Sequence, residues 1–141
     1  MADIQLSEHF QLHEFTDSFI ARLKGLSNEP TAEAVERLKN LCQQVLEPLR
    51  QWAGRPVQIS SGYRSPAVNL AVGGVPSSQH LRGEAADILL PSLEVGWQWF
   101  CYLRDHLPYD QLIWETYHTR HWIHVSCKAE IKENRHQVIV L

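Results

Sequence analysis

Two histidines and one aspartate occur in this sequence at a spacing that suits the binding of a metal ion. His80 and Asp87 stand seven positions apart, with Gly83 and two alanines between them, and His124 follows within an apolar run. A catalytic zinc ion uses three nitrogen or oxygen ligands from the protein and keeps a fourth position for water. Gly83 permits an unusual backbone angle between the first two residues. The sequence therefore predicts that His80, Asp87 and His124 bind one zinc ion.

The surroundings of these residues favour metal binding over a structural role. His80 follows a segment rich in glycine, proline and serine at residues 73–78, and functional residues often lie on such loops. Asp87 stands in an apolar run, where a buried carboxylate requires a partner. The spacing alone also occurs where a histidine is structural and an aspartate lies on the surface. The loop and the apolar run make a metal site the preferred interpretation.

The other histidines and the cysteines do not form a second recognisable site. His9 and His13 stand four apart, and we expect a surface pair because the nearby sequence offers no third ligand. Cys42, Cys101 and Cys127 include no Cys-x-x-Cys pair, so they are expected to be buried free thiols. An odd number of cysteines without a disulfide framework is typical of a reducing compartment.

The composition is that of an ordinary globular chain. Its 141 residues suggest one domain over 1–141, and a hydrophobic fraction of 44% allows a core without disulfides. The net charge of −3 includes no basic region, so we expect no binding of nucleic acid. No apolar run is long enough to span a bilayer. The first residues lack a basic start and an apolar stretch, so we expect no signal peptide and a cytoplasmic location as synthesised.

The clearest helix is predicted over residues 31–53. Apolar residues recur there every three to four positions, and Thr31 is a suitable N-cap. Pro48 should kink the last turn or end the helix. Further helices are expected within residues 3–26, where one short helix is predicted, and over residues 92–106.

Short alternating or apolar runs predict the strands of a small sheet. These strands are expected at residues 57–60, 85–90, 109–115, 121–127 and 137–141. The third and fourth should form a hairpin around a loop of residues 116–120. Helices that precede the strands, with one more helix interposed, indicate an α+β fold. The expected architecture is a small, mostly antiparallel sheet with the N-terminal helices packed on it.

A ten-residue segment resembles a known metallopeptidase signature. Ser78, His80, Gly83, Ala85 and Asp87 match the pattern SxHxxGxAxD, which is typical of zinc peptidases of the M15 type. The segment Ser60–Ser65 is similar to the one that supplies the active-site arginine of these enzymes, and Trp122–His124 to the one with the last ligand. The resemblance extends roughly over residues 5–127.

The resemblance implies hydrolysis of a peptide by a zinc-activated water. M15 enzymes include D-alanyl-D-alanine carboxypeptidases, D-Ala-D-Ala dipeptidases and phage L-alanyl-D-glutamate endolysins, and their fold resembles that of the hedgehog signalling domain. The implied partner is a peptidoglycan stem peptide or another peptide that contains D-alanine, and the enzyme, with its Zn2+, is expected to be a monomer. A phage-type enzyme of this kind would reach the cell wall after lysis.

Two further residues receive roles from the resemblance. Arg64 would steady an oxyanion or a substrate carboxylate, because its planar guanidinium suits both. Without the resemblance, a surface salt bridge would be the preferred interpretation of Arg64. Ser78 would hydrogen-bond the substrate.

The general base is open at this stage. In the family it is commonly a Glu or Asp three residues before the last ligand, and that position is His121 here. Glu115 is the rival, because it could face His121 across the hairpin. One could be the base and the other its orienting partner, or Glu115 could be an ordinary hairpin carboxylate. Strict alternation places His121 and His124 on opposite faces, so His121 reaches the metal only from an irregular strand start.

Two other functions compete with peptide hydrolysis. A non-catalytic zinc module of hedgehog-like fold would use the same ligands for binding. A non-haem iron oxygenase also uses two histidines and a carboxylate, but its usual HxD spacing differs from the six intervening residues here. The sequence does not distinguish a carboxypeptidase from an endopeptidase, nor a phage protein from a cellular one.

Overall fold

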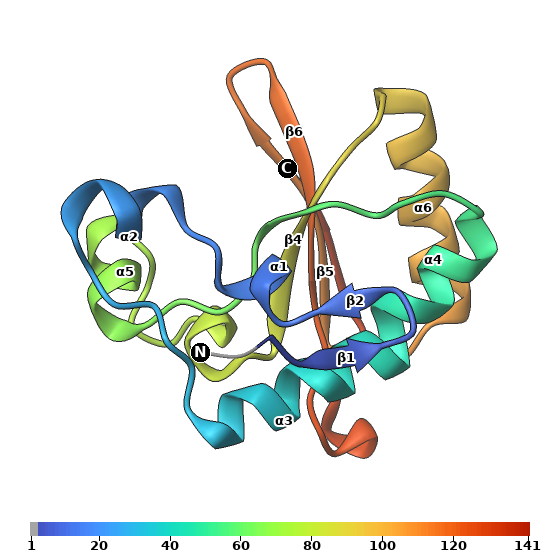
Figure 1. Cartoon of the computed structure of the whole chain (residues 1–141). Helices are drawn as coiled ribbons and strands as arrows, with labels where there is room; N and C mark the ends of the chain where they lie inside the picture. Colours follow the sequence, from blue (N-terminus) through green and yellow to red (C-terminus); the bar gives the residue numbers. More distant parts are fainter. Residues whose placement is uncertain (1–2) are drawn as a thin grey trace.

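A five-stranded sheet forms the centre of the protein, whose computed structural model describes residues 3–141 (Figure 1). In spatial order its strands are β3 (Ile59–Ser61), β4 (Ala85–Leu89), β6 (Arg120–Ser126), β5 (Gln111–Tyr117) and β7 (Gln137–Val140). All neighbours are antiparallel except β5 and β7, which are parallel. The predicted α+β fold with a small, mostly antiparallel sheet is confirmed.

Helices lie on both sides of this sheet. They are α1 (His13–Thr16), α2 (Phe19–Lys24), α3 (Ala32–Leu41), α4 (Glu47–Ala53), α5 (Pro66–Ala71) and α6 (Leu93–His106). In Figure 1, α4 and α6 lie to the right of the sheet, and α2 and α5 to its left. The N-terminal region holds more than the one predicted helix: α1 and α2 follow a small hairpin of β1 (Gln5–Ser7) and β2 (Phe10–Gln11). None of the helices in the described chain is long and apolar enough to cross a membrane.

The long helical segment begins as the sequence predicts. The Thr31 side chain accepts a hydrogen bond from the backbone N–H of Ala34, which caps α3. Leucines of this segment are fully buried against the sheet and α6, and the main ones are Leu38, Leu41, Leu46 and Leu49. The segment therefore packs on the sheet along one apolar stripe.

Pro48 does not end this helical segment. A π-helical turn at Cys42–Leu46 joins α3 to α4, and Pro48 lies in the first turn of α4. In a π turn each carbonyl bonds the N–H five residues ahead instead of four. In an α-helix, the carbonyl four residues before Pro48 would face a nitrogen that has no hydrogen. In the π turn this carbonyl can instead bond the N–H of the residue after Pro48. The helix continues to Ala53, and Gly54 closes it at a φ of 67°.

The register of β4, β6 and β5 divides their side chains between two faces. Asp87 pairs with His124, and His124 also pairs with Ile113. Because side chains alternate along a strand, these residues share one face, and Ile88 and Ile123 point into the core on the other. The β5–β6 loop contains only two residues, where the sequence analysis expected five, because both strands extend closer to the turn than predicted.

Candidate active site and metal centre

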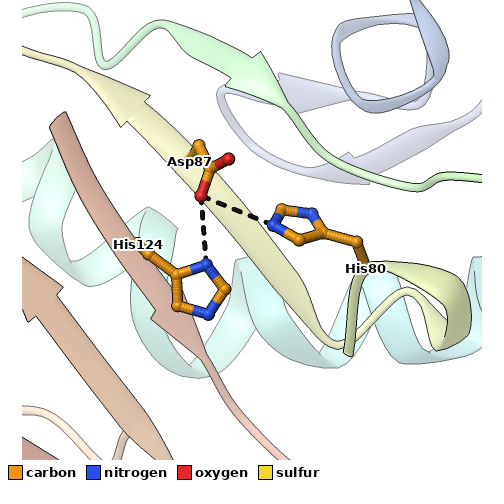
Figure 2. A group of neighbouring side chains, drawn as sticks. All are labelled: His80, Asp87 and His124. Carbon is orange, nitrogen blue, oxygen red and sulfur yellow. Dashed lines mark hydrogen bonds and ion pairs between the residues drawn. The ribbon is translucent and has the colours of Figure 1, made fainter. Parts of the chain in front are cut away.

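Asp87 and His124 meet because their strands are neighbours in the sheet. They are directly opposite one another in the β4–β6 ladder, so their side chains leave the same face. His124 Nδ1 lies 3.0 Å from Asp87 Oδ1, as Figure 2 shows. Both side chains are largely buried, with exposed fractions of 13% for His124 and 11% for Asp87.

His80 reaches the same carboxylate from the loop before β4. It lies in a short 3-10 helix, Gln79–Arg82, whose first turn is capped by the Ser78 hydroxyl. The ring Nδ1 is 2.6 Å from the carbonyl oxygen of Gly62, and since a carbonyl can only accept, Nδ1 carries the proton. Nε2 is therefore the nitrogen with a free lone pair, and it lies 3.4 Å from Asp87 Oδ1 (Figure 2).

Gly83 ends this 3-10 helix in the left-handed conformation, which is an unusual backbone angle of the kind that the sequence analysis allowed for. Its φ is 77°, and its N–H closes the turn onto the carbonyl of His80. A Cβ atom at this position would lie 2.5 Å from the carbonyl oxygen of Ala34 on α3. The close approach of α3 therefore holds the loop that carries His80 against the body of the protein.

The three side chains fit a zinc ion by donor type and by separation. One ligand atom from each of His80, Asp87 and His124 lies within 4.8 Å of the other two. Zinc-to-ligand distances near 2.0–2.2 Å in a tetrahedron separate ligand atoms by about 3.3 Å. The separations of 3.0 and 3.4 Å between the histidine nitrogens and Asp87 Oδ1 are close to this value. The hydrogen bond to Gly62 supplies the outer support that metal-binding histidines usually have.

Asp87 is held in its charged form. Burial by itself raises the pKa of this carboxyl, but the polar contacts with the rings of His124 and His80 outweigh burial and hold the pKa well below the usual value. The guanidinium of Arg64 adds positive charge, with Nη2 at 3.7 Å from Asp87 Oδ2. A carboxylate that stays ionised is what a metal ligand requires.

Arg64 is fixed beside this group by contacts along its whole length. Its backbone N–H donates to the carbonyl of His80 at 3.0 Å. Nε donates to the Ser61 hydroxyl at 3.3 Å, and Nη1 to the side-chain oxygen of Asn69 at 3.4 Å. Only 19% of the side chain is exposed, so the guanidinium is oriented rather than freely solvated. Asn69, on α5, is a supporting residue that the sequence analysis did not identify.

Glu115 lines the same cleft as His80 and His124, whereas His121 lines the second cleft, which Asp87 and Arg64 also border. Glu115 is opposite Trp122 in the β5–β6 ladder, so it shares the face of His124 and lines the cleft there. Burial raises the pKa of its carboxyl above the usual value; a smaller effect of His124 lowers the pKa, and the charge of Asp87 raises it further. A carboxylate with a raised pKa, beside a metal site, suits proton transfer at neutral pH.

His121 lies on the other face of the sheet. It pairs with Thr116, and its Nδ1 is 2.9 Å from the hydroxyl of that residue. Its ring centroid is 5.9 Å from that of Trp114. The β6 ladder runs without a bulge from Arg120 to Ser126, so the irregular strand start that His121 would need is not present.

The candidate ligands lie between two clefts of similar size. One cleft, of about 590 Å³, contains Ser78, His80, Glu115 and His124 in its wall. The other, of about 600 Å³, extends toward α2 and α5. Arg64, Asp87 and Trp122 border both. The face of the sheet that carries the ligands is therefore accessible from two directions.

His9 has different partners from those expected. His9 Nδ1 is 2.6 Å from Glu47 Oε2 on α4, and His13 pairs separately with Asp3. Glu8 lies close enough to complete a second group of potential ligands. The Glu47 carboxylate, however, already accepts hydrogen bonds from the Ser7 hydroxyl, the His9 backbone, the His9 ring and the Gln51 amide. We interpret this group as an ion pair that fastens the β1–β2 hairpin to α4.

Comparison with known proteins agrees with this arrangement of residues. A search of curated proteins finds no match. The family model described as peptidase M15 matches residues 8–126, which include Arg64, Glu115 and all three candidate ligands. The match covers most of the chain and agrees with the resemblance seen in the sequence. The chain therefore belongs to the peptidase M15 family.

Proposed function

We propose that this protein is a zinc-dependent metallopeptidase that hydrolyses D-amino-acid-containing peptides of bacterial peptidoglycan. The observation that carries the proposal is the convergence of His80, Asp87 and His124 beside Glu115 and Arg64 in one cleft. Membership of the peptidase M15 family supports the peptidase chemistry. The SxHxxGxAxD resemblance to enzymes of cell-wall peptides supports the substrate class.

Each residue of the group has a distinct task in this proposal. Zinc held by the three ligands would polarise the scissile carbonyl and lower the pKa of a water molecule. Glu115 takes the proton from the attacking water and returns it to the leaving amine. Arg64, oriented by Ser61 and Asn69, stabilises the negative charge that develops on the carbonyl oxygen.

Ser78 has a structural contact that agrees with its proposed position. Its hydroxyl accepts the backbone N–H of His80 at 3.2 Å, and the residue lines the cleft. A hydroxyl can donate one hydrogen bond while it accepts another. Ser78 can therefore support His80 and donate to a substrate carbonyl at the same time.

The two clefts favour cleavage within a peptide. An extended substrate needs room on both sides of the scissile bond, and clefts leave Asp87 in two directions. A carboxypeptidase would instead need a closed end close to the ligands, with a partner for the terminal carboxylate. We therefore propose endopeptidase activity, and release of single D-alanine residues is the alternative outcome.

Mass spectrometry of muropeptides tests the proposal. Zinc-loaded protein is incubated with purified muropeptides, with and without a chelator, and a Glu115→Gln variant serves as the inactive control. We expect cleavage that the chelator prevents, with products that each contain more than one residue. Loss of single D-alanine would indicate a carboxypeptidase. A zinc-loaded protein that cleaves no muropeptide would instead support a hedgehog-like binding module.

A further inference from the structure

One end of the ligand-bearing cleft is lined by basic side chains that the proposed reaction does not use. These residues are Arg82, Lys128 and Arg135, and they are named the cationic arm below. We propose that the cationic arm binds a free carboxylate of the peptide substrate, close to the scissile bond. The inference rests on the proposed function, and it specifies which peptides the site prefers.

Arg135 is held in the wall by a buried acid. Asp110 is fully buried and accepts hydrogen bonds from the Arg135 backbone at 2.8 Å, from Nε at 3.1 Å and from Nη2 at 2.8 Å. Half of the Arg135 side chain is exposed, although Asp110 fixes its guanidinium. Asp110 itself does not border the cleft, so it orients the arginine without presenting negative charge to a ligand.

Lys128 is a second cation at the same end, and its charge is only loosely paired. Its ammonium lies 3.9 Å from Asp110 Oδ1, beyond hydrogen-bonding distance, and Arg135 already bonds that carboxylate. The backbone N–H of Lys128 donates to the Asn134 side chain at 2.8 Å, which fixes the position of its main chain. The ammonium is therefore available to an anionic group that enters the cleft.

Arg82 completes the arm from the 3-10 helix before β4. Its Nε donates to Glu84 at 2.8 Å, and Glu84 is buried behind it with 8% exposure. This contact uses one nitrogen and leaves the terminal nitrogens of the guanidinium for a ligand. Within the described residues, the acids that line this cleft are Asp87 and Glu115, both beside the ligands rather than in the arm. The three cations of the arm outnumber the carboxylates of Asp110 and Glu84 behind them, so the net charge of this end favours an anion although the whole chain is acidic.

The position of the arm sets the position of the carboxylate. Ile113 pairs with the ligand His124. Gln111 lies two residues farther along β5 in the wall of the same cleft, next to Asp110, which holds Arg135 of the arm. Two strand residues span about 7 Å, which is about the length of two residues of an extended peptide. The preferred carboxylate therefore belongs to a residue one or two positions from the scissile bond.

A matched pair of peptides tests the inference. The two are identical except that one carries a free carboxylate, and the other a carboxamide, next to the cleaved bond. Zinc-loaded wild type should hydrolyse the carboxylate peptide with a kcat/KM at least about tenfold higher, the size of a charge-assisted contact. Lys128→Met and Arg82→Gln should each reduce this ratio toward one by slowing the carboxylate peptide only. The ratio should also fall as salt is raised.

Lys132→Met is the control, because Lys132 is exposed and does not line the cleft. Arg135 is left intact, since its removal would strand the buried Asp110. A wild-type ratio near one, or a ratio unchanged in both variants, overturns the inference. If neither peptide is cleaved, the proposed function fails, and calorimetric titration of the zinc-loaded protein with both peptides decides the inference. Tighter binding of the carboxylate form, lost in Lys128→Met, supports it, and equal binding overturns it.

Discussion

Glu115 and His121 lie on opposite faces of the central sheet, although β5 and β6 are hydrogen-bonded neighbours. Glu115 is opposite Trp122, and His121 is opposite Thr116, so the two side chains differ by one step of the ladder. That step places Glu115 in the cleft with His80 and His124, and His121 beside Trp114 in the wall of the second cleft. The assignment of the proton-transfer role follows from this difference.

Replacement of Glu115 should therefore abolish turnover without removal of the metal. Glu115→Gln keeps the shape of the side chain and removes the basic oxygen, so kcat should fall by about 10²–10⁴-fold. His121→Ala should retain most of kcat. Zinc content, measured by elemental analysis, should be unchanged in both. A larger loss of kcat in His121→Ala than in Glu115→Gln would reverse the assignment.

Metal binding should depend on the three ligands and on no other histidine. The protein should hold about one zinc ion per chain after dialysis, as expected for one site with three protein ligands. His80→Ala, Asp87→Asn and His124→Ala should each lose most of it. His106→Ala is the matched control, because His106 ends α6 at the surface. Retention of full zinc content by His80→Ala would contradict the proposed site.

Arg64 should contribute to the reaction and not to metal retention. Arg64→Met removes a donor placed next to the ligands, so kcat/KM should fall by about 10²–10³-fold while zinc content is kept. Arg55→Met, at an exposed position, controls for loss of positive charge. Steady-state kinetics and elemental analysis on the same samples separate the two effects. Normal kinetics in Arg64→Met would remove this residue from the mechanism.

The contact between His9 and Glu47 should make the free energy of unfolding depend on pH. Burial raises the pKa of Glu47, but hydrogen bonds from His9, Ser7 and Gln51 outweigh it and lower the pKa from 4.5 to about 2. A depressed carboxyl pKa adds stability above pH 4.5, and this stability is lost as the pH falls toward 2.

Urea denaturation of wild type and Glu47→Gln measures this contribution. At pH 7 the variant should unfold with a free energy lower by about 1–3 kcal/mol, because hydrogen bonds to a charged group are lost. The difference should shrink between pH 4.5 and 2. Glu94→Gln, in the first turn of α6, provides the control for removal of a negative charge. A difference that stays constant with pH would exclude the ion pair as its source.

Gly83 should tolerate no side chain. Its φ of 77° and the 2.5 Å approach of a Cβ to the Ala34 carbonyl act together, so Gly83→Ala should cost about 2–4 kcal/mol of unfolding free energy. Gly73→Ala tests the backbone strain alone, because Gly73 has a φ of 74° and open space around it. That variant should lose about 1–2 kcal/mol. Equal losses in both, by thermal or urea unfolding, would show that contact with α3 is unimportant.

The candidate ligands could be predicted because their side-chain types and local sequence are distinctive. His80 and Asp87 belong to one short motif, and Asp87 and His124 stand on apolar strands whose alternation places them on one face. The α+β fold followed from the order of helical and strand patterns. The motif and the apolar alternation depend on neighbouring residues and can be seen in the sequence, whereas the pairing of Asp87 with His124 is a long-range contact.

Other features depend on contacts between distant segments. The choice between Glu115 and His121 required the length of the β5–β6 loop, and an error in loop length changes which residues share a face. The cationic arm required the parallel pairing of β5 and β7, which brings Arg135 to Asp110. The π turn before Pro48 also has no recognisable sequence pattern, because it differs from an α-helix in hydrogen-bond partners and not in composition.

The two-residue turn at His118 and Thr119 also constrains how this hairpin could vary. His118 adopts a φ of 55°, and the turn fixes which residues of β5 and β6 are opposite. One inserted residue, followed by a slip of β5, would put Thr116 in the place of Glu115 and turn the acid inward. Two inserted residues would restore the original orientation. Natural lengthening of this turn should therefore be tolerated in even steps and selected against in odd ones.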